Sequence, residues 1–216
     1  MPGNYKTLLQ AAQDEYIVNK SRFIGLAAPC DTEDAALAFL RSVREKYKDA
    51  THHCYAYIIG QNAGVMRYSD DGEPGGTAGM PIIEVMKARG VVNCCVVVVR
   101  YFGGILLGAG GLVRAYSHSC AIALNAAQVV MMERSVRYLM DVPYTLWDKV
   151  RYLLKSLPQI TEDTAFGTSV EATLLLRETQ ADGVLDKITA ATDGKAEFLE
   201  TERLHYPWPE EKQDEA

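Results

Sequence analysis

Hydrophobic positions in the first part of the chain follow two periods, one typical of strands and one typical of helices. Residues 16–28 predict a β-hairpin that turns at residues 19–21, and residues 53–59 with 65–68 predict a second hairpin. Between them, apolar side chains recur at helical spacing after Thr32, a residue type that caps helix N-termini and is followed here by two acids. The pattern predicts a strand-rich domain with a helix between its hairpins.

Two further helices and a buried strand complete this first domain. A helix is predicted from residue 81 to about residue 90, because proline suits a first helical turn and glycine suits a helix end. Residues 94–99 form a continuous apolar run, which indicates a strand covered on both faces. A long helix is predicted over residues 112–127. We expect this domain to occupy residues 1–134, of which the first 14 carry no strong pattern.

The rest of the chain changes to the order β-α-β-β-α-β. Strands are predicted over 138–144, 160–165, 169–177 and 195–204, and helices over 147–157 and 181–192. This order is the split β-α-β, or ferredoxin-like, arrangement. The sequence therefore predicts an α+β protein with a ferredoxin-like second domain over residues 135–206 and an acidic, frayed tail over residues 207–216.

Composition narrows the class of protein. Of the 216 residues, 48% are hydrophobic, which is enough for a packed core without disulfides. The five cysteines are odd in number and form no Cys-x-x-Cys pair, so they favour reduced thiols in a cytoplasmic protein. No apolar run reaches the roughly 20 residues that span a bilayer, and the N-terminus lacks a signal-peptide pattern. We expect a cytoplasmic protein with no membrane partner.

Charge is divided unevenly along the chain. Residues 1–136 hold 13 Lys and Arg against 12 Asp and Glu, a net charge of +1, whereas the remainder holds 9 against 16, a net charge of −7. The second part should repel a phosphate backbone over most of its surface. A nucleic-acid contact is therefore expected to be local and to lie on the first part.

The first candidate segment has the sequence SDDGEPGGTAG and leads into a predicted helix N-terminus, where free N–H groups favour anions. One interpretation is a recognition loop in which Asp70, Asp71 and Glu73 meet a basic partner or a metal ion. Thr77 and Gly79 would then shape the helix entrance. The other interpretation is a solvated turn that only reverses the chain, because Asp-Gly pairs and glycines are typical of turns.

The second candidate segment has the sequence RYFGGILLGAGG. It contributes Arg100, Tyr101, Gly103, Gly104 and Gly108, and the helix after it places Arg114 and His118 on one face. Arg100 ends the buried strand, and ligands bind at such strand ends in open α/β sheets. The segment predicts either an anion site or close helix–strand packing, with Arg100 paired to a carboxylate such as Asp70. It matches neither a Walker loop nor Gly-x-Gly-x-x-Gly.

Other chemistry-bearing residues give weaker patterns. His52 and His53 are adjacent in a predicted strand, so one should be buried and one exposed. We find no convincing set of four converging zinc ligands and no context that marks an activated nucleophile. The sequence therefore predicts no metal and no cofactor, and it favours a binding protein over an enzyme.

The two candidate segments resemble the signature of the YigZ/IMPACT family, also called uncharacterised protein family 0029. KSRFI at residues 20–24 and HHCYAY at residues 52–57 fit the same pattern. The residues that match the signature are Asp70, Asp71, Gly72, Glu73, Pro74, Thr77, Ala78, Gly79, Arg100, Tyr101, Gly103, Gly104 and Gly108. The resemblance implies a first domain like the second domain of ribosomal protein S5, a β/α sandwich. It also implies a second domain like one of elongation factor G.

The resemblance also implies a role in translation. Eukaryotic members of the family bind an activator of the kinase that phosphorylates an initiation factor, and so restrain that kinase. We expect this chain to lack their additional N-terminal domain and to carry the ferredoxin-like domain instead. We therefore expect a translation-linked binding protein whose partner is RNA, the ribosome or a translation-associated protein. A phosphate- or nucleotide-handling enzyme and a protein–protein adaptor are the alternatives.

Overall fold

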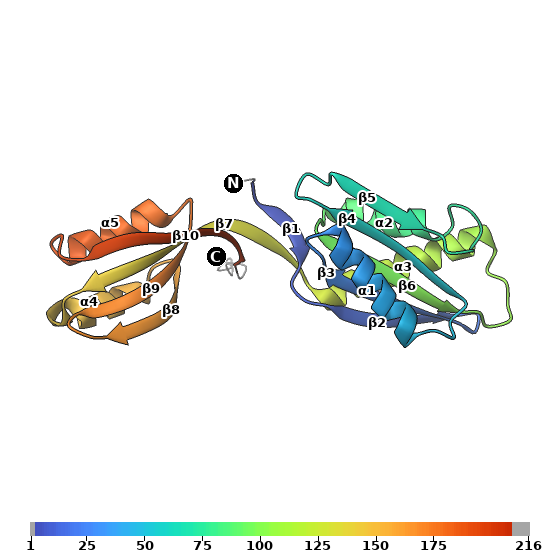
Figure 1. Cartoon of the computed structure of the whole chain (residues 1–216), viewed down its shortest axis with the longest axis horizontal. Helices are drawn as coiled ribbons and strands as arrows, with labels where there is room; N and C mark the ends of the chain where they lie inside the picture. Colours follow the sequence, from blue (N-terminus) through green and yellow to red (C-terminus); the bar gives the residue numbers. More distant parts are fainter. Residues whose placement is uncertain (1–2, 209–216) are drawn as a thin grey trace, which may run out of the picture. The chain divides into compact units, whose positions relative to one another are not determined.

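A computed structural model of the chain describes residues 3–208 (Figure 1). It divides into two compact units: the first is Tyr5–Met131, and the second holds residues 132–208 together with residues 3–4. The predicted domain break after residue 134 falls inside one continuous strand, β7 (Val129–Val142). Each unit is α+β, with its own antiparallel sheet and its own core.

Five antiparallel strands form the sheet of the first unit in the order β2-β3-β6-β4-β5. They are β2 (Ala12–Val18), β3 (Ser21–Pro29), β4 (His52–Ile59), β5 (Val65–Ser69) and β6 (Cys94–Tyr101). Both predicted hairpins are confirmed. The β2–β3 turn has two residues, Asn19 and Lys20, with φ of 46° and 62°, the left-handed pair that matches strand twist.

The first 14 residues hold structure that the sequence pattern did not indicate. They include β1 (Tyr5–Leu8) and the beginning of β2. All seven residues of β2 are at least partly exposed, and its sequence, AQDEYIV, does not alternate cleanly between apolar and polar residues. Leu8 nevertheless reaches the core of the unit.

Helices cover both faces of this sheet. Helix α1 (Glu33–Lys46) lies over one face, and α2 (Gly79–Arg89) and α3 (Gly108–Ala127) lie over the other (Figure 1). In β6, Val96 and Val98 pack in the core with α2 and α3, whereas Val97 and Val99 pack in the core with α1. The prediction of a doubly covered strand is confirmed. The analogy between the end of this strand and the ligand sites of open α/β sheets is wrong, because both neighbours of β6 run antiparallel to it.

Two predicted helix caps of the first unit are confirmed. The Thr32 hydroxyl accepts a hydrogen bond of 3.1 Å from the Ala35 N–H, and Gly90 ends α2 with φ of 67°. Helix α3 begins at Gly108, four residues before the predicted start. Glycine lowers helix propensity, so the first turn of this helix reads as loop in the sequence.

The second unit has the predicted β-α-β-β-α-β order. After β7 come α4 (Tyr144–Leu154), β8 (Gln159–Phe166), β9 (Val170–Arg177), α5 (Ala181–Ala191) and β10 (Glu197–Pro207). Its strands pair in the antiparallel order β10-β7-β9-β8, and β1 also pairs with β7 in this five-stranded sheet. Leu174 and Leu176 of β9 pack with Val150 of α4 and Ile188 of α5 in one core. Within residues 3–208, none of the helices combines the length and apolar character that a membrane span requires.

The first two residues of the predicted tail belong to the fold. Pro207 ends β10, and Trp208 is only 8% exposed. The Trp208 indole N–H donates a hydrogen bond of 2.8 Å to the Ser135 hydroxyl, and the guanidinium of Arg177 lies 4.5 Å from the ring centre. A frayed tail from residue 207 is therefore wrong for these two positions, and residues 209–216 lie outside the described part.

Candidate functional site

Asp70 organises the loop between β5 and α2. Its carboxylate accepts hydrogen bonds from the backbone N–H groups of Gly76, Ala78 and Gly79, at 2.8, 3.0 and 2.8 Å. Desolvation opposes ionisation of Asp70, but these three donors together hold its pKa below the ordinary value. The acid satisfies free N–H groups where α2 begins, a position where negative charge is favourable. It is therefore a structural part of the loop.

Asp71 and Thr77 fix the same loop at two other points. Asp71 has a φ of 43°, and its carboxylate accepts a hydrogen bond of 2.7 Å from the His53 N–H and one of 3.2 Å from Arg44. The Thr77 hydroxyl donates to the Pro74 carbonyl at 2.7 Å. The acids of this segment are bonded into the fold, whereas Pro74, Gly75 and Gly76 are exposed, so the segment is neither a turn held by solvent alone nor a set of free carboxylates.

Glu73 and Arg100 form a buried ion pair beneath the loop. Arg100 Nη1 donates to Glu73 Oε1 at 2.6 Å, and the two side chains are 5% and 3% exposed. The expected pairing of Arg100 with Asp70 is wrong, because Asp70 turns to the backbone of its own loop. The guanidinium also lies 5.3 Å from the ring centre of Phe23 and 5.4 Å from that of Phe102, so aromatic faces flank the charge.

Three further side chains complete this buried network, and the sequence analysis did not assign them to the site. The Tyr116 hydroxyl donates to Glu73 Oε1 at 2.7 Å, and Cys54 Sγ lies 3.3 Å from that hydroxyl. His52 Nε2 lies 3.9 Å from the same Glu73 oxygen. Burial raises the pKa of Tyr116 well above its ordinary value, and Cys54 and Glu73 add to the rise, so the phenol keeps its proton. A tyrosine on the apolar face of a predicted helix was the available signal, because a buried phenol needs a partner.

Cross-strand register explains why these residues meet. Arg100 of β6 stands opposite Phe23 of β3 and His52 of β4, so the three side chains share the face that α2 and α3 cover. Tyr116 reaches them from α3. Both histidines are half-buried, with side chains 20% and 11% exposed, so the expectation of one buried and one exposed is wrong. Loops and helices cover both faces at this end of the sheet.

Two glycines allow backbone segments to approach closely around the network. A Cβ atom on Gly79 would lie 2.8 Å from backbone atoms of Ser69, and one on Gly103 would lie 2.0 Å from the carbonyl carbon of Lys20. The Gly103 N–H donates to the Ser21 hydroxyl at 3.2 Å. The loop after β6 is therefore packed directly on the turn between β2 and β3.

The structure separates the other predicted site residues from this network. The Tyr101 hydroxyl donates to Asp49 at 2.9 Å, because alternation in β6 turns it away from Arg100. Arg114 and His118 are exposed on α3, with the His118 ring 4.4 Å from that of Tyr16. Gly104 and Gly108 have φ of 80° and 69° and lie in exposed backbone.

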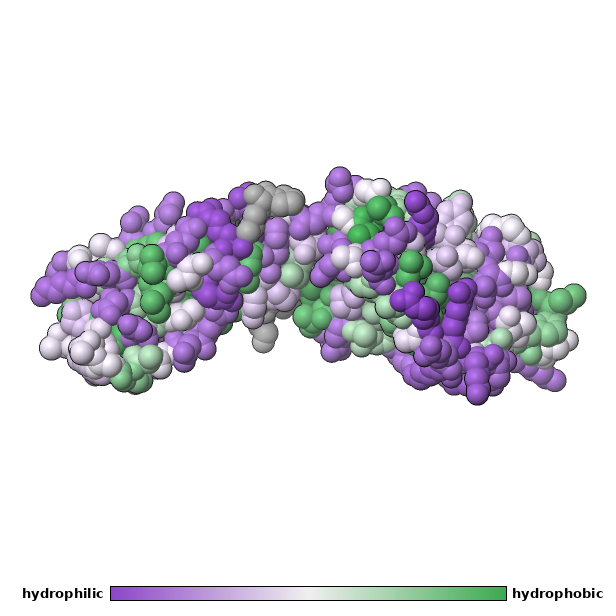
Figure 2. Space-filling view, viewed as in Figure 1, coloured by the Kyte–Doolittle hydropathy of each residue, from purple (hydrophilic) through white to green (hydrophobic). Residues whose placement is uncertain are grey.

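Above the buried network the surface is apolar. The loop between β6 and α3 exposes Phe102, Ile105 and Leu106, and Leu106 is 84% exposed. Figure 2 shows hydrophobic residues at the end of the first unit where Figure 1 places this loop. Isolated apolar side chains are ordinary on a surface, but three within five residues form a patch.

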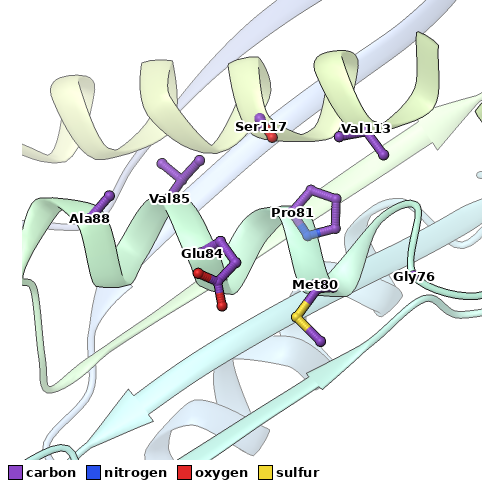
Figure 3. Close-up of a pocket in the computed structure, with 8 residues that line it drawn as sticks. All are labelled: Gly76, Met80, Pro81, Glu84, Val85, Ala88, Val113 and Ser117. Atoms are coloured by element: carbon purple, nitrogen blue, oxygen red, sulfur yellow. The ribbon is translucent and has the colours of Figure 1, made fainter. Parts of the chain in front are cut away.

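An apolar groove lies between α2 and α3, and α3 follows this loop in the sequence. Its volume is about 430 Å³, and Figure 3 shows Pro81 and Val85 of α2 on one side and Val113 and Ser117 of α3 on the other. Gly76, Met80, Glu84 and Ala88 complete its lining. Gly76 belongs to the first candidate segment, and Val113 lies two residues after the end of the second. The two segments therefore lead to one groove.

Charged and apolar side chains of this site are separated between its interior and its surface. Glu73 and Arg100 pair with each other inside the fold, although Arg100 Nε is buried without a hydrogen-bond partner among the described residues. The exposed surface presents apolar side chains and glycine backbone. Among residues 3–208, no group of three or more His, Cys, Asp or Glu residues is placed to hold a metal ion.

Known proteins match the chain along most of its length. The Impact N-terminal domain matches residues 19–124, and a domain of unknown function, DUF1949, matches residues 140–195. A solved structure titled "Crystal structure of an hypothetical protein" is 30% identical, with a TM-score of 0.58 and coverage of 94% of this chain and 99% of that one.

Curated relatives carry the family name. IMPACT family member YigZ of Escherichia coli is 48% identical over 110 residues, 50% of this chain and 54% of the relative. Protein IMPACT homolog of Saccharomyces cerevisiae is 32% identical over 100 residues, 45% of this chain and 39% of the relative. IMPACT family member YvyE of Bacillus subtilis is 37% identical over 201 residues, which are 92% of each protein. With such a match along both chains, this protein belongs to the IMPACT family.

Proposed function

We propose that this chain is a translation-linked binding protein whose first unit recognises a protein partner. The contact surface is the binding face, which we define as Phe102, Ile105 and Leu106 of the β6–α3 loop together with Met80 and Val113 of the groove. The exposed apolar side chains of the loop carry the proposal, because Leu106 leaves most of its surface in solvent. Exposed apolar patches of this kind mark protein interaction sites.

The side chains available at this face favour a protein partner over RNA. RNA backbones are bound by exposed Lys and Arg, and their contribution dominates such affinities. Arg100 is buried against Glu73, so its charge is already neutralised within the fold. Arg114 is exposed beside the groove, but the groove lining itself holds Glu84 and no cation.

The groove suits an amphipathic helix of the partner. It lies between two helices, and Gly76, Ala88 and Ser117 are small enough for another backbone to come close. A helix with apolar residues on one face can lie between such ridges, in the way that helix-in-groove complexes form. We therefore infer that the partner presents an apolar helical stripe.

We also propose that the protein acts in translation and that it is located in the cytoplasm. The resemblance to eukaryotic members that bind an activator of a translation-controlling kinase supports the link to translation. The partner is then a translation-associated protein, and the chain acts by occupying it rather than by turnover.

Affinity capture from cell lysate tests the proposal. The full chain should retain a translation-associated protein in nuclease-treated and untreated lysate alike. Leu106→Asp and Val113→Asp should lose that protein, because a charge at a buried apolar contact is costly. Leu199→Asp is the matched control, since Leu199 is an exposed leucine of β10 in the second unit. Loss of the retained protein after nuclease treatment, or equal retention by all variants, contradicts the proposal.

A further inference from the structure

Strand β8 places polar side chains where a core strand would place apolar ones. It is an edge strand of its sheet, and among the strands of residues 3–208 it pairs with β9 alone. Gln159, Thr161 and Thr164 stand opposite Leu176, Leu174 and Ala172, which belong to the core. Paired residues of antiparallel strands point to the same face. These polar groups therefore face the side of the sheet that α4 covers.

A pocket opens between this strand and α4. Its volume is about 260 Å³, and it is lined by Trp147, Arg151, Leu154, Lys155, Gln159, Thr161 and Thr164. The lining combines an indole ring, two cationic side chains and three neutral polar ones, without a carboxylate. Gln159 is held in place, because its amide N–H₂ donates to the Leu154 carbonyl at 3.1 Å and its amide oxygen accepts from Thr161 at 3.0 Å.

Aromatic rings continue from one wall of the pocket. The ring of Trp147 meets that of Phe166 edge-on at 6.3 Å, and Phe166 stacks against Tyr144 at 6.4 Å. Phe166 and Tyr144 are both exposed. Three rings thus lie in a row along α4 and the end of β8: Trp147 also packs against the core of the unit, whereas core packing does not require the two exposed rings.

The two charged side chains that line the pocket, Arg151 and Lys155, are both cationic, although the second unit is acidic. Lys149, Arg151 and Lys155 lie on or directly after α4. Arg151 pairs with Asp148 at 2.9 Å, but the two side chains are 63% and 88% exposed, so an anion can displace this weak pair. Of the acids on β8, Glu162 is bound by Arg137, and Asp163 accepts the Thr164 N–H.

We propose that this pocket binds a nucleotide unit of single-stranded RNA. The base stacks on Trp147, and its phosphates lie against Arg151 and Lys155. Proteins bind single-stranded nucleic acid by stacking its bases on aromatic side chains and by pairing its phosphates with cationic side chains. Phe166 and Tyr144 give the adjoining bases further rings. This site lies in the second unit and does not depend on the binding face of the first.

The chain provides its own optical probe for the test. It has two tryptophans, and Trp208→Phe leaves Trp147 as the sole indole. A 12-nucleotide oligouridine should quench Trp147 emission in a saturable way at 50 mM salt, and affinity should fall as salt rises. Uridine monophosphate is the free-nucleotide arm, and it should bind at least tenfold more weakly. In parallel, fluorescence anisotropy of a labelled oligouridine should show binding by the unmodified full chain, independently of the tryptophan substitution.

Matched variants separate this pocket from general attraction. Arg151→Ala with Lys155→Ala should weaken oligouridine binding at least tenfold and reduce the salt slope by about 1.4, the contribution of two phosphate contacts to a single strand. Trp147→Ala should weaken anisotropy-detected binding likewise. Lys187→Ala with Lys195→Ala, which removes two exposed cations elsewhere in the same unit, should leave binding unchanged.

Three outcomes overturn the proposal. One is the absence of both quenching and anisotropy change at 50 mM salt. Another is equal weakening by the two double variants, which would reduce the interaction to net charge. The third is uridine monophosphate binding as tightly as the oligonucleotide, which would assign the pocket to a free nucleotide instead of RNA.

Discussion

Glu73 accepts a hydrogen bond from Arg100, and the distance from Nη1 to Oε1 is 2.6 Å. Both side chains are almost completely buried. The acid comes from the loop before α2, and the arginine comes from the end of β6. Tyr116 of α3 donates to the same oxygen. One carboxylate thus ties together the three elements that support the binding face.

Arg100→Ala should destabilise the protein by about 3–5 kcal/mol. Removing one partner of a buried ion pair leaves the other charge without compensation, which costs more than the pair itself contributes. Urea denaturation of the full chain, followed by far-ultraviolet circular dichroism, measures the change.

Arg114→Ala is the control for this prediction, because Arg114 is exposed on α3. Its effect should stay within about 0.5 kcal/mol. In a double-mutant cycle, Glu73→Ala combined with Arg100→Ala should cost far less than the sum of the two single changes. Equal effects of the two arginine substitutions would refute the buried pair.

The parts of the fold that sequence predicts well are those where local periodicity and chemistry agree. The run from Cys94 to Val99 indicated burial on both faces because every position is apolar, and helices do cover both faces. Thr32 and Gly90 marked helix ends, since their side-chain and backbone preferences act within a few residues. The β-α-β-β-α-β order of the second unit followed from the same local patterns.

The site required information that the sequence pattern does not contain. Strand direction is set by pairing between distant segments, so the apolar run of β6 could not show that its neighbours are antiparallel. Glu73, rather than the equally acidic Asp70, pairs with Arg100 because the loop turns Asp70 back to its own N–H groups. Tyr116 lies within the predicted helix 112–127, and helical spacing alone does not show that its hydroxyl completes the network.

Gly103→Ala should destabilise the protein more than Gly104→Ala. A Cβ on Gly103 would collide with backbone atoms of Lys20, which cannot rotate away, so we expect a cost of at least about 1–3 kcal/mol. A Cβ on Gly104 meets no described heavy atom within 4 Å, and only its φ of 80° costs about 1–2 kcal/mol. Melting temperatures of the two variants test this order. A Gly104→Ala variant that melts lower than Gly103→Ala contradicts the close packing of the loop on the β2–β3 turn.

Asp70→Asn should change how stability depends on pH. The lowered pKa of Asp70 in the folded state means that its carboxylate stabilises the fold above its unfolded pKa of about 3.9. That contribution is lost as pH falls through the folded value. The wild type should therefore exceed Asp70→Asn in stability most clearly above about pH 5, and the difference should shrink toward pH 2. Denaturation curves at a series of pH values measure it, and a constant difference across that range contradicts the assignment.

The cysteines should be inert in the native protein and should report when the network opens. All five are buried and free, and burial raises the pKa of Cys30 to about 11 and that of Cys54 to about 12. At pH 8 a disulfide reagent such as DTNB should therefore react with no thiol in the native state and with five in denaturant.

The Arg100→Ala variant extends this assay to one residue. Cys54 Sγ lies 3.3 Å from the Tyr116 hydroxyl and 3.0 Å from the Asp70 carbonyl oxygen, so loosening the network should expose it first. Cys95 packs in the core beneath α1 and should stay protected. Mass spectrometry after brief labelling at pH 8 distinguishes the two sites. Prompt labelling of Cys54 in the wild type, or labelling of Cys95 before Cys54 in the variant, would show that the Glu73–Arg100 pair does not hold this part of the fold closed.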